Sequence, residues 1–573
     1  MIPVVVILVY LAVIAVIGGV AYRRAKSNTE DFFLASRGVG STVFFLSLFA
    51  TNMTAFAILG SSGQAYRQGI GIYGLMASSS GLVIPLTIFL IGTRLWAIGK
   101  RFGHQTQVAF FRDRWECGGI GTVIFALCAA MLVPYMIISI MGGGTVLADI
   151  STPKGATEPM IPYALGCAIV AVVVTAGVFL GGMRGTVWVN ILQTTLFLLF
   201  GAVAVFVISQ HLPKGFGEYM SALAADAKTS ALVTREKMPP RFFWSYTLIP
   251  LSSIMFPHMA IMCFSAKKVT AFKRTVIIYP IAIMLIWLPC VFLGVLGAAA
   301  LGKVSDPDGV LLRMLANYAP AWLAGILGAG IISAVMGSDA HQVLALSTMF
   351  TKDIYQHYGG SKKFGEKGAV MFARIFIVLV TVGAFFVALE LKDKQGIFEI
   401  AVRYAFSGFA AMAPVMVAAL FWKRSTKWGA LASTLFVGAS LIGFGAMQGS
   451  PAAPPASPAK PVAQTNAPAS VVSVALVPSA SASLDATNRT NVTNAPAAVP
   501  AKPKVIWQIG EGKDAIQVIS LALNGDVRFL GFMTVVPMVF GSALCMILFS
   551  LLTRPPSAKT IEKYFPRPAG AAN

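Results

Sequence analysis

Long apolar stretches, separated by short polar segments, dominate the hydrophobic pattern of this chain. A helix needs about 20 predominantly apolar residues to cross the hydrocarbon core of a bilayer, and thirteen stretches approach or exceed that length. The pattern therefore predicts an all-α integral membrane protein with about thirteen transmembrane helices, near residues 2–22, 42–62, 72–97, 119–146, 161–181, 186–209, 242–264, 275–301, 318–350, 370–390, 396–422, 428–447 and 530–552.

Two of the predicted spans, the second and the seventh, are interrupted in the middle. Thr51, Asn52 and Thr54 cluster inside the second span, and Pro250 and Pro257 break the hydrogen-bond ladder of the seventh. Broken helices expose backbone carbonyls that can hold a cation and helix N-termini that favour an anion. Interrupted spans at corresponding positions of two halves are typical of a transporter site between inverted repeats.

The span near 318–350 ends in a segment rich in polar residues, which include Ser338, Asp339 and His341. Asp339 is the only acidic residue in the apolar part of any predicted span. Ionisable residues inside a membrane are costly and usually functional. Two structural alternatives stay open: Asp339 forms a structural pair with another residue, and His341 is a packed, hydrogen-bonded side chain. The segment predicts a helix that lines a route for something polar.

Composition and charge narrow the class of protein further. Hydrophobic residues make up 57% of the chain and charged residues 12%, and the mean hydropathy is +0.76, which excludes a soluble enzyme. The net charge of +22 is unevenly distributed, because the inward loops and tail hold 25 Lys and Arg and the short outward loops hold 7. Basic residues favour the cytoplasmic side. This predicts a cell-membrane protein with its N-terminus outside and its C-terminus in the cytoplasm, and no nucleic-acid partner.

The domain organisation follows from the apolar pattern. Residues 1–447 form the expected transporter core, 448–529 an extracytoplasmic insert, 530–552 the last transmembrane helix and 553–573 a cytoplasmic tail. The part of the insert from Pro451 to Lys504 is rich in Pro, Ala and Ser, which predicts disorder because little apolar surface is available to bury. Val505–Arg528 has a more mixed composition and is expected to form a short outer element.

Four sequence blocks resemble the conserved motifs of the sodium:solute symporter family and occur in that family's order. They lie at Thr29–Arg37, Leu59–Gly69, Gly181–Gln193 and Ser333–Tyr355. The resemblance implies a leucine-transporter-type core with a five-plus-five inverted repeat, about 42–209 and 242–422, and two broken helices. It also implies uptake of a small solute driven by sodium through alternating access, with sodium as coupling ion, no other cofactor and no enzymatic activity.

The sodium site that the resemblance implies falls on five residues of two helices. It uses backbone carbonyls of the first broken helix and carbonyl and hydroxyl oxygens of the polar helix, which correspond here to Ala50, Met53, Ala334, Gly337 and Ser338. The last three are spaced i, i+3 and i+4, so they share one helix face. Sodium is a hard cation that prefers oxygen ligands, as calcium and magnesium do.

Three departures from the family pattern affect the coupling ion. Gly337 stands where the family usually has Ser, so one hydroxyl is missing and Gly337→Ser is expected to tighten sodium dependence. Asn190 replaces a usual Asp, and Asp339-Ala-His341 shifts a carboxylate by one position. These changes leave two alternatives open. One is an uncoupled or proton-coupled transporter that uses Asp339 and His341, and the other is a membrane sensor or regulatory protein that has lost coupled transport.

The substrate residues are less sharply defined. Asn52, Thr54, Tyr135 and Asn190 are the candidates for contact with a small-molecule substrate, and each also has a structural reading as a cap, a packed side chain or an interhelical hydrogen bond. Sugar-binding relatives carry polar residues just after the first break, whereas this chain has Phe56 and Ala57 there, which argues against a sugar as substrate. The Phe256-Pro-His258 segment resembles pantothenate- and monocarboxylate-type members, which favours an organic anion.

Overall fold

The computed structural model of this chain describes residues 2–23, 29–153, 156, 158–227, 229–304, 306–392, 394–448, 504–509, 516–522 and 525–566. Its contacts divide the chain into two compact units, Met1–Ala446 with Phe532–Asn573, and Met447–Gly531. The tract predicted to be disordered lies outside the described residues except for Lys504, and so does part of the predicted tail, from 567 to 573.

Apolar helices build the first unit, and ten of those in the described ranges are long and apolar enough to cross a membrane. Two bent helix pairs raise this number to twelve. The ten candidate spans lie within α1 (Ile2–Arg23), α5 to α7 (Gly71–Phe102), α9 (Gly118–Ser151), α10 (Tyr163–His211), α15 (Thr270–Ala300), α17 with η8 (Ala321–Gln356), α18 (Gly360–Leu391), α19 to α21 (Ile397–Phe421), α22 (Lys427–Met447) and α23 (Val535–Leu552).

The 49 residues of α10 form two spans rather than one. At about 1.5 Å per residue, such a helix is more than twice as long as the roughly 30 Å hydrocarbon core. Gly182 turns the chain with φ 52° and ψ −148°, and a side chain there would lie 2.7 Å from the carbonyl oxygen of Phe32. The break falls between the spans predicted at 161–181 and 186–209, so the sequence prediction of thirteen crossings agrees with the structure.

Both predicted interruptions are present as bends within a span. In the first, α3 (Ser41–Asn52) meets η2 and α4 (Phe56–Gln68) at 62°, and in the second, α12 and α13 (Pro240–Met255) meet α14 (Pro257–Ser265) at 51°. Met53 leaves the helix with φ −92° and ψ 106°, whereas Phe256 is extended just before Pro257. Irregular backbone of this kind is tolerated at membrane depth only where protein or a water-filled path surrounds it.

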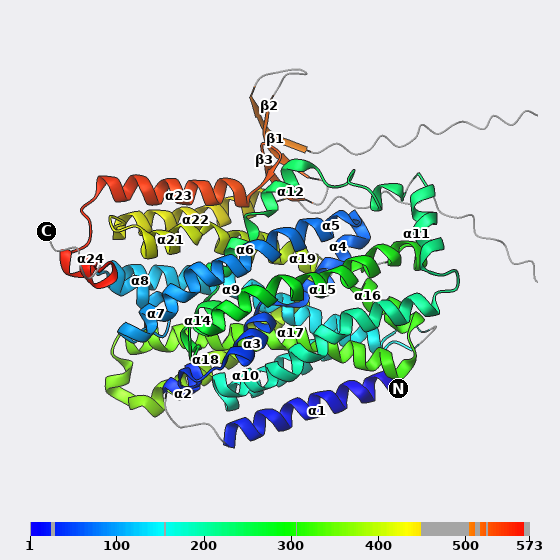
Figure 1. Cartoon of the computed structure of the whole chain (residues 1–573), viewed down its shortest axis with the longest axis horizontal. Coiled ribbons are helices and arrows are strands. Elements are labelled where there is room, and N and C mark those ends of the chain that lie inside the picture. The colour runs from blue at the N-terminus through cyan, green and yellow to red at the C-terminus, as the bar shows by residue number, and fades with distance from the viewer. Residues whose placement is uncertain are drawn as a thin grey trace, which may run out of the picture. The chain divides into compact units, whose positions relative to one another are not determined.

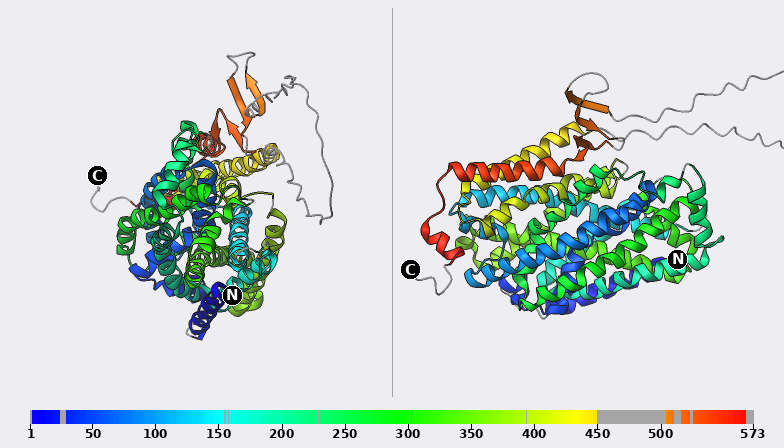
Figure 2. Two further views of the ribbon diagram at one scale, coloured as in Figure 1. Left: turned by 90° about the vertical axis from the view of Figure 1, so that its right-hand side faces the viewer. Right: turned by 45° about the horizontal axis from the view of Figure 1, so that its top comes forward.

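Helix α17 lies in the interior of the first unit and α1 at its margin (Figures 1 and 2). Nearly all residues from Ala324 to Met349 are buried, because α17 packs against α1, α3, α9 and α10. In contrast, α1 leaves Ile2, Val5 and Val9 more than half exposed, as expected of side chains that face lipid. The polar side chains of α17 are therefore shielded from lipid by the neighbouring helices.

Shorter elements connect the spans or complete the chain. The described helices outside the spans are α2 (Thr29–Leu34), η1 (Ala35–Arg37), α8 (Gln107–Arg114), α11 (Phe216–Ala225), η5 (Ser230–Leu232), η7 (Pro307–Gly309), α16 (Val310–Tyr318) and α24 (Ala558–Tyr564). Strand β4 (Phe532–Met533) belongs to the first unit, where the Met533 amide donates to Ser245 Oγ at 3.1 Å.

The second unit contains three described strands, which occupy the segment predicted to form a short outer element. β1 (Lys504–Ile509) pairs antiparallel with β2 (Ile516–Leu521), with Gln508 opposite Gln517. β2 in turn pairs antiparallel with β3 (Val527–Phe529), with Ser520 opposite Arg528. The prediction of an entirely helical chain therefore holds for the spans but misses these strands.

Close packing between α4 and α15 depends on a glycine. A Cβ at Gly294 of α15 would lie 2.3 Å from the Ser62 carbonyl oxygen and 3.0 Å from the Ala65 side chain. Small residues let helices approach closely in membranes, where packing replaces the hydrophobic effect. Gly294 therefore sets how near the second half of the first broken helix lies to α15.

We expect Gly294→Ala to destabilise the protein by about 1–3 kcal/mol, because the added methyl group meets backbone atoms that cannot move aside. Thermal unfolding of the purified protein in detergent measures the change. Gly383→Ala is the matched control, since a Cβ there has no neighbour within 4 Å. Equal melting temperatures for the two variants would contradict this account of the packing.

Candidate functional site

The implied sodium residues lie at the end of α3 and in the middle of α17. Ala50, Met53, Ala334 and Ser338 are at most 1% exposed, and Gly337 is buried with them. A Cβ built at Gly337 would lie 3.7 Å from the Ala50 Cβ, so the structure brings the two helices together at these residues. The Ser338 hydroxyl donates to the Val335 carbonyl at 3.2 Å, which leaves its lone pairs available for a cation.

Two amide side chains of α10 point at the same place. The Oδ1 atom of Asn190 and the Oε1 atom of Gln193 lie 3.2 and 3.0 Å from the Cβ position of Gly337. Both oxygens are buried, and neither has a hydrogen-bond partner among the described residues. They fill the space that a serine hydroxyl would occupy, and carbonyl-type oxygens are suitable ligands for a hard cation.

Hydrogen bonds at the other end of each amide fix these orientations. Asn190 Nδ2 lies 3.0 Å from His341 Nδ1, and Gln193 Nε2 donates to the Tyr10 hydroxyl at 3.4 Å. His341 Nδ1 is also 3.2 Å from the Gly337 carbonyl oxygen. One ring nitrogen of a neutral imidazole either donates or accepts, so His341 can satisfy Asn190 or Gly337 but not both at once. The tautomer of His341 therefore determines whether Nδ1 accepts from Asn190 or donates to the Gly337 carbonyl oxygen.

Asp339 is next to Ser338 in sequence but is separate from this group. It is fully buried, and neither carboxyl oxygen has a hydrogen-bond partner in the described part of the chain. A coupling role for Asp339 stays a prediction. The same holds for a proton role of His341, whose Nε2 is likewise buried and unpartnered among the described residues.

The four substrate candidates do not form one group. Thr54 and Tyr135 are both buried and their side chains interact, while Thr54 Oγ1 also accepts from the Phe56 amide at 3.1 Å. Asn52 instead donates to the Tyr279 hydroxyl of α15 at 2.7 Å. Asn190 lies with the proposed ion ligands at Gly337. The substrate role of all four residues stays a prediction.

Aromatic rings join the two broken helices. Tyr135 lies 5.2 Å from Phe256 and 5.0 Å from Phe406 between ring centroids, and Phe406 lies 4.7 Å from Phe56 at the first break. His258 stacks on Phe256 at 4.9 Å. We call Phe56, Tyr135, Phe256, His258 and Phe406 the aromatic cluster. Sequence reasoning missed Phe406, because residues far apart in the chain form the cluster.

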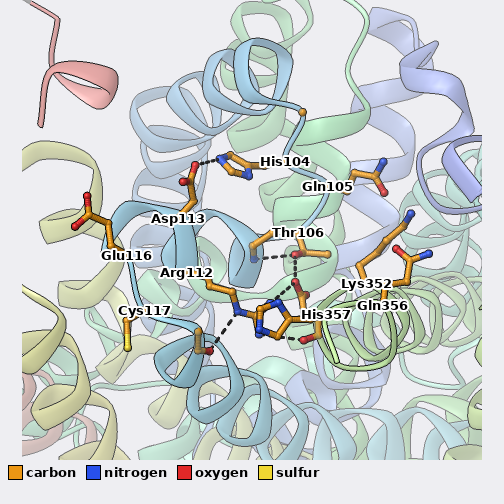
Figure 3. A pocket seen from close by; sticks show the side chains of 14 residues that line it. His104, Gln105, Thr106, Arg112, Asp113, Glu116, Cys117, Lys352, Gln356 and His357 are labelled. Atoms are coloured by element: carbon orange, nitrogen blue, oxygen red, sulfur yellow. Dashed lines mark hydrogen bonds and ion pairs between the residues drawn. The ribbon is translucent and has the colours of Figure 1, made fainter. Parts of the chain in front are cut away.

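A cavity of about 670 Å³ lies elsewhere, between the loop after α7 and the end of α17. Figure 3 shows its side chains, with Thr106 donating to Asp353 at 3.0 Å and His104 3.2 Å from Asp113. Burial lowers the pKa of His104, and the Asp113 carboxylate offsets part of that effect. None of the predicted site residues lines this cavity, whose residues are Gly103, His104, Gln105, Thr106, Ala109, Arg112, Asp113, Glu116, Cys117, Gly118, Lys352, Asp353, Gln356 and His357.

Helix α8 connects this cavity to the second broken helix. Gln107 Nε2 donates to the Met255 carbonyl at 2.9 Å, one residue before the extended Phe256. At the other end of α8, Arg114 is buried and donates to the Ala419 carbonyl at 3.0 Å. The terminal helix α24 packs on the same segment through Lys563, whose ammonium lies 2.5 Å from the Asp113 carboxylate. The Gln107 bond therefore joins α8 to the end of α13, just before the second break.

Two broken helices and a buried helix rich in polar residues are typical of a secondary transporter. The sodium:solute symporter family matches residues 32–438, and the chain belongs to this family. It is 25% identical to the sodium/pantothenate symporter of Escherichia coli over 75% of this chain and 88% of that relative. It is also 25% identical to the sodium/proline symporter of Staphylococcus aureus over 74% of this chain and 82% of that relative.

A solved structure supports the fold. The substrate-bound outward-open state of a Na⁺-coupled sialic acid symporter matches with a TM-score of 0.63 at 16% identity, over 78% of this chain and 91% of that one. The family match and this likeness confirm the predicted leucine-transporter-type core.

We expect the bond between Asn52 and Tyr279 to stabilise the first break. In a double-mutant cycle of Asn52→Ala and Tyr279→Phe, the coupling free energy should be about 0.6 kcal/mol, typical of interhelical hydrogen bonds in membranes. Thermal unfolding in detergent supplies the four values. Tyr279→Phe combined with Ser433→Ala is the control and should be additive, since Ser433 contacts Ser542 instead. Additivity of the Asn52 and Tyr279 changes would show that the bond contributes nothing.

Proposed function

We propose that this chain is a sodium-coupled symporter that imports a small polar organic solute by alternating access. Family membership supports the coupled transport, and the convergence of buried amide oxygens on Gly337 is the observation that carries the proposal. The basic bias of the predicted inward loops supports an orientation with the N-terminus outside the cell and the C-terminus in the cytoplasm.

The proposed sodium ion lies between α3 and α17, with α10 completing the site. Carbonyl oxygens of Ala50 and Met53 and oxygens of Ala334 and Ser338 provide the ligands that the family resemblance implies. The unpartnered amide oxygens of Asn190 and Gln193 support a further step, in which they compensate for the hydroxyl that Gly337 lacks. A buried polar atom without a partner is expensive, which favours the bound state of the ion.

Sodium binding would couple to the substrate through the first broken helix. Ala50 and Met53 flank Asn52, and the Thr54 side chain interacts with Tyr135, a member of the aromatic cluster that reaches the second break. An ion that fixes the end of α3 would therefore order the residues beside the substrate. The names of relatives, which include pantothenate and proline symporters, favour a small organic acid or amino acid as substrate.

We expect Ser338→Ala to raise the sodium concentration for half-maximal stabilisation of the purified protein about tenfold. The change removes one oxygen ligand and leaves the packing intact, and a lost contact to a charged group weakens binding by about this factor. Melting temperature against sodium concentration, at constant ionic strength with potassium, gives the value.

Ser347→Ala on the same helix is the matched control, because Ser347 donates to the Ala373 carbonyl at 3.2 Å and lies outside the proposed site. The control should leave the sodium dependence unchanged. If the parent protein and Ser338→Ala ignore sodium alike, and solute uptake follows a proton gradient, the ion assignment is wrong and coupling moves to Asp339 and His341.

The contacts around Gly337 favour the opposite of the sequence-based expectation for Gly337→Ser. A Cβ at this position lies 3.0 Å from Gln193 Oε1 and 3.2 Å from Asn190 Oδ1, so it displaces the proposed ligands. We expect Gly337→Ser to weaken sodium-dependent stabilisation by roughly tenfold, as overpacking typically costs about 1–3 kcal/mol. Adding Gln193→Ala should relieve the crowding and recover part of the loss. Tighter sodium binding by Gly337→Ser alone would show that the amide oxygens are not ligands.

A further inference from the structure

The second broken helix carries a feature that the sodium site does not use. Helix α14 begins at Pro257 in the interior of the protein, and no side chain caps its N-terminus. The first N–H groups of a helix have no partner within the helix and carry partial positive charge. At the first break, by contrast, Thr54 Oγ1 accepts the Phe56 amide. The two breaks therefore differ in what they can bind.

His258, the second residue of α14, is a separate observation that points to a ligand. It is 1% exposed, and neither Nδ1 nor Nε2 has a hydrogen-bond partner in the described ranges. Few buried polar groups in native proteins lack a partner, and each such group calls for an explanation. An imidazole N–H beside free backbone N–H groups is a donor set for an anion.

The surroundings of His258 restrict the size and shape of that anion. Its ring stacks on Phe256 at 4.9 Å and lies 5.7 Å from Tyr135, while Phe409 lies 5.1 Å from Phe256. These rings present apolar faces, so only the acidic end of a ligand can meet the donors at the start of α14. Because His258 is buried, the ligand reaches it only when the aromatic cluster opens, as alternating access requires.

We propose that the start of α14 binds the carboxylate of the transported solute, with His258 and the free backbone amides of α14 as donors. The substrate class is thus a small carboxylic acid whose apolar or hydroxylated body packs against Tyr135 and Phe406. This inference rests on the proposed symport function and gives it a specificity residue. It also links substrate to the inner face, since Gln107 holds the Met255 carbonyl just before the break.

Matched pairs of acids and neutral analogues test the proposal on the full-length purified protein. The probes are pantothenate against panthenol, L-proline against L-prolinamide and propionate against propionamide, with D-galactose as a neutral sugar. The melting temperature is measured for each probe in sodium chloride and in potassium chloride. At least one acid should stabilise the protein in sodium, and its neutral partner should bind roughly 10- to 100-fold more weakly, because a hydrogen-bonded charge is lost.

Variants of His258 identify the residue involved. His258→Phe keeps the ring packing and removes the donor, so the stabilising acid should bind roughly 10- to 100-fold more weakly. His258→Gln keeps a donor and should retain most of the affinity, and it serves as the test if His258→Phe does not fold. Sodium-dependent stabilisation without any probe should stay unchanged in both variants.

The outcomes distinguish a failure of the carboxylate site from a failure of the proposed sodium symport. If sodium stabilises the protein but no acid binds, or each acid and its neutral partner bind equally, the carboxylate site is wrong and sodium symport stands. Full acid binding by His258→Phe overturns the role of His258. If sodium itself has no effect in the parent protein, the proposed function fails, and the inference fails with it.

Discussion

Backbone polar groups have no water to bond with inside a bilayer, and the rest of this structure depends on that constraint. A continuous helix satisfies all of them, whereas each broken helix here leaves N–H and C=O groups free near its bend. The two breaks are tolerated because protein surrounds them: α10, α15 and α17 pack on α3 at Met53, and α7, α17 and α20 pack on α13 and α14 at Phe256. Partners for the freed groups come from Thr54 at the first break and from Gln107 at the second.

The groups that remain unsatisfied are the ones with functional potential. Asn190, Gln193 and His258 are among the buried side chains with unpartnered atoms in the described chain, and all three lie beside a broken helix or beside α17. Amide oxygens gather at Gly337, where a cation would satisfy them, and donors gather at the start of α14, where an anion would. The separation of acceptors from donors is what a symporter of sodium and an organic anion needs.

Much of the fold could be predicted from local sequence patterns. The apolar stretches located the spans, including the division of α10 at Gly182, and the prolines and polar clusters located both breaks. Strands β1 to β3 escaped detection because elements of three to six residues carry a weak periodic signal. The bounds of the core, insert and tail that the sequence suggests remain predictions, since much of the insert lies outside the described residues.

The candidate site was only partly predictable, because its contacts join distant segments. Helical spacing placed Ala334, Gly337 and Ser338 on one face. Sequence alone could not show that α10 faces Gly337. For the same reason the pairing of Asn52 with Tyr279 was unexpected, although the two residues lie 2.7 Å apart between side-chain atoms.

Direct binding of radioactive sodium to the purified full-length protein tests the central claim. The account predicts saturable binding that unlabelled sodium displaces and potassium does not, with weaker binding in a protein that carries Asn190→Ala. The loss follows from removing an amide oxygen that lies 3.2 Å from the Cβ position of Gly337. Sodium binding that is absent in the parent protein, or unchanged when both Asn190 and Ser338 are replaced by alanine, would contradict a cation site between α3, α10 and α17.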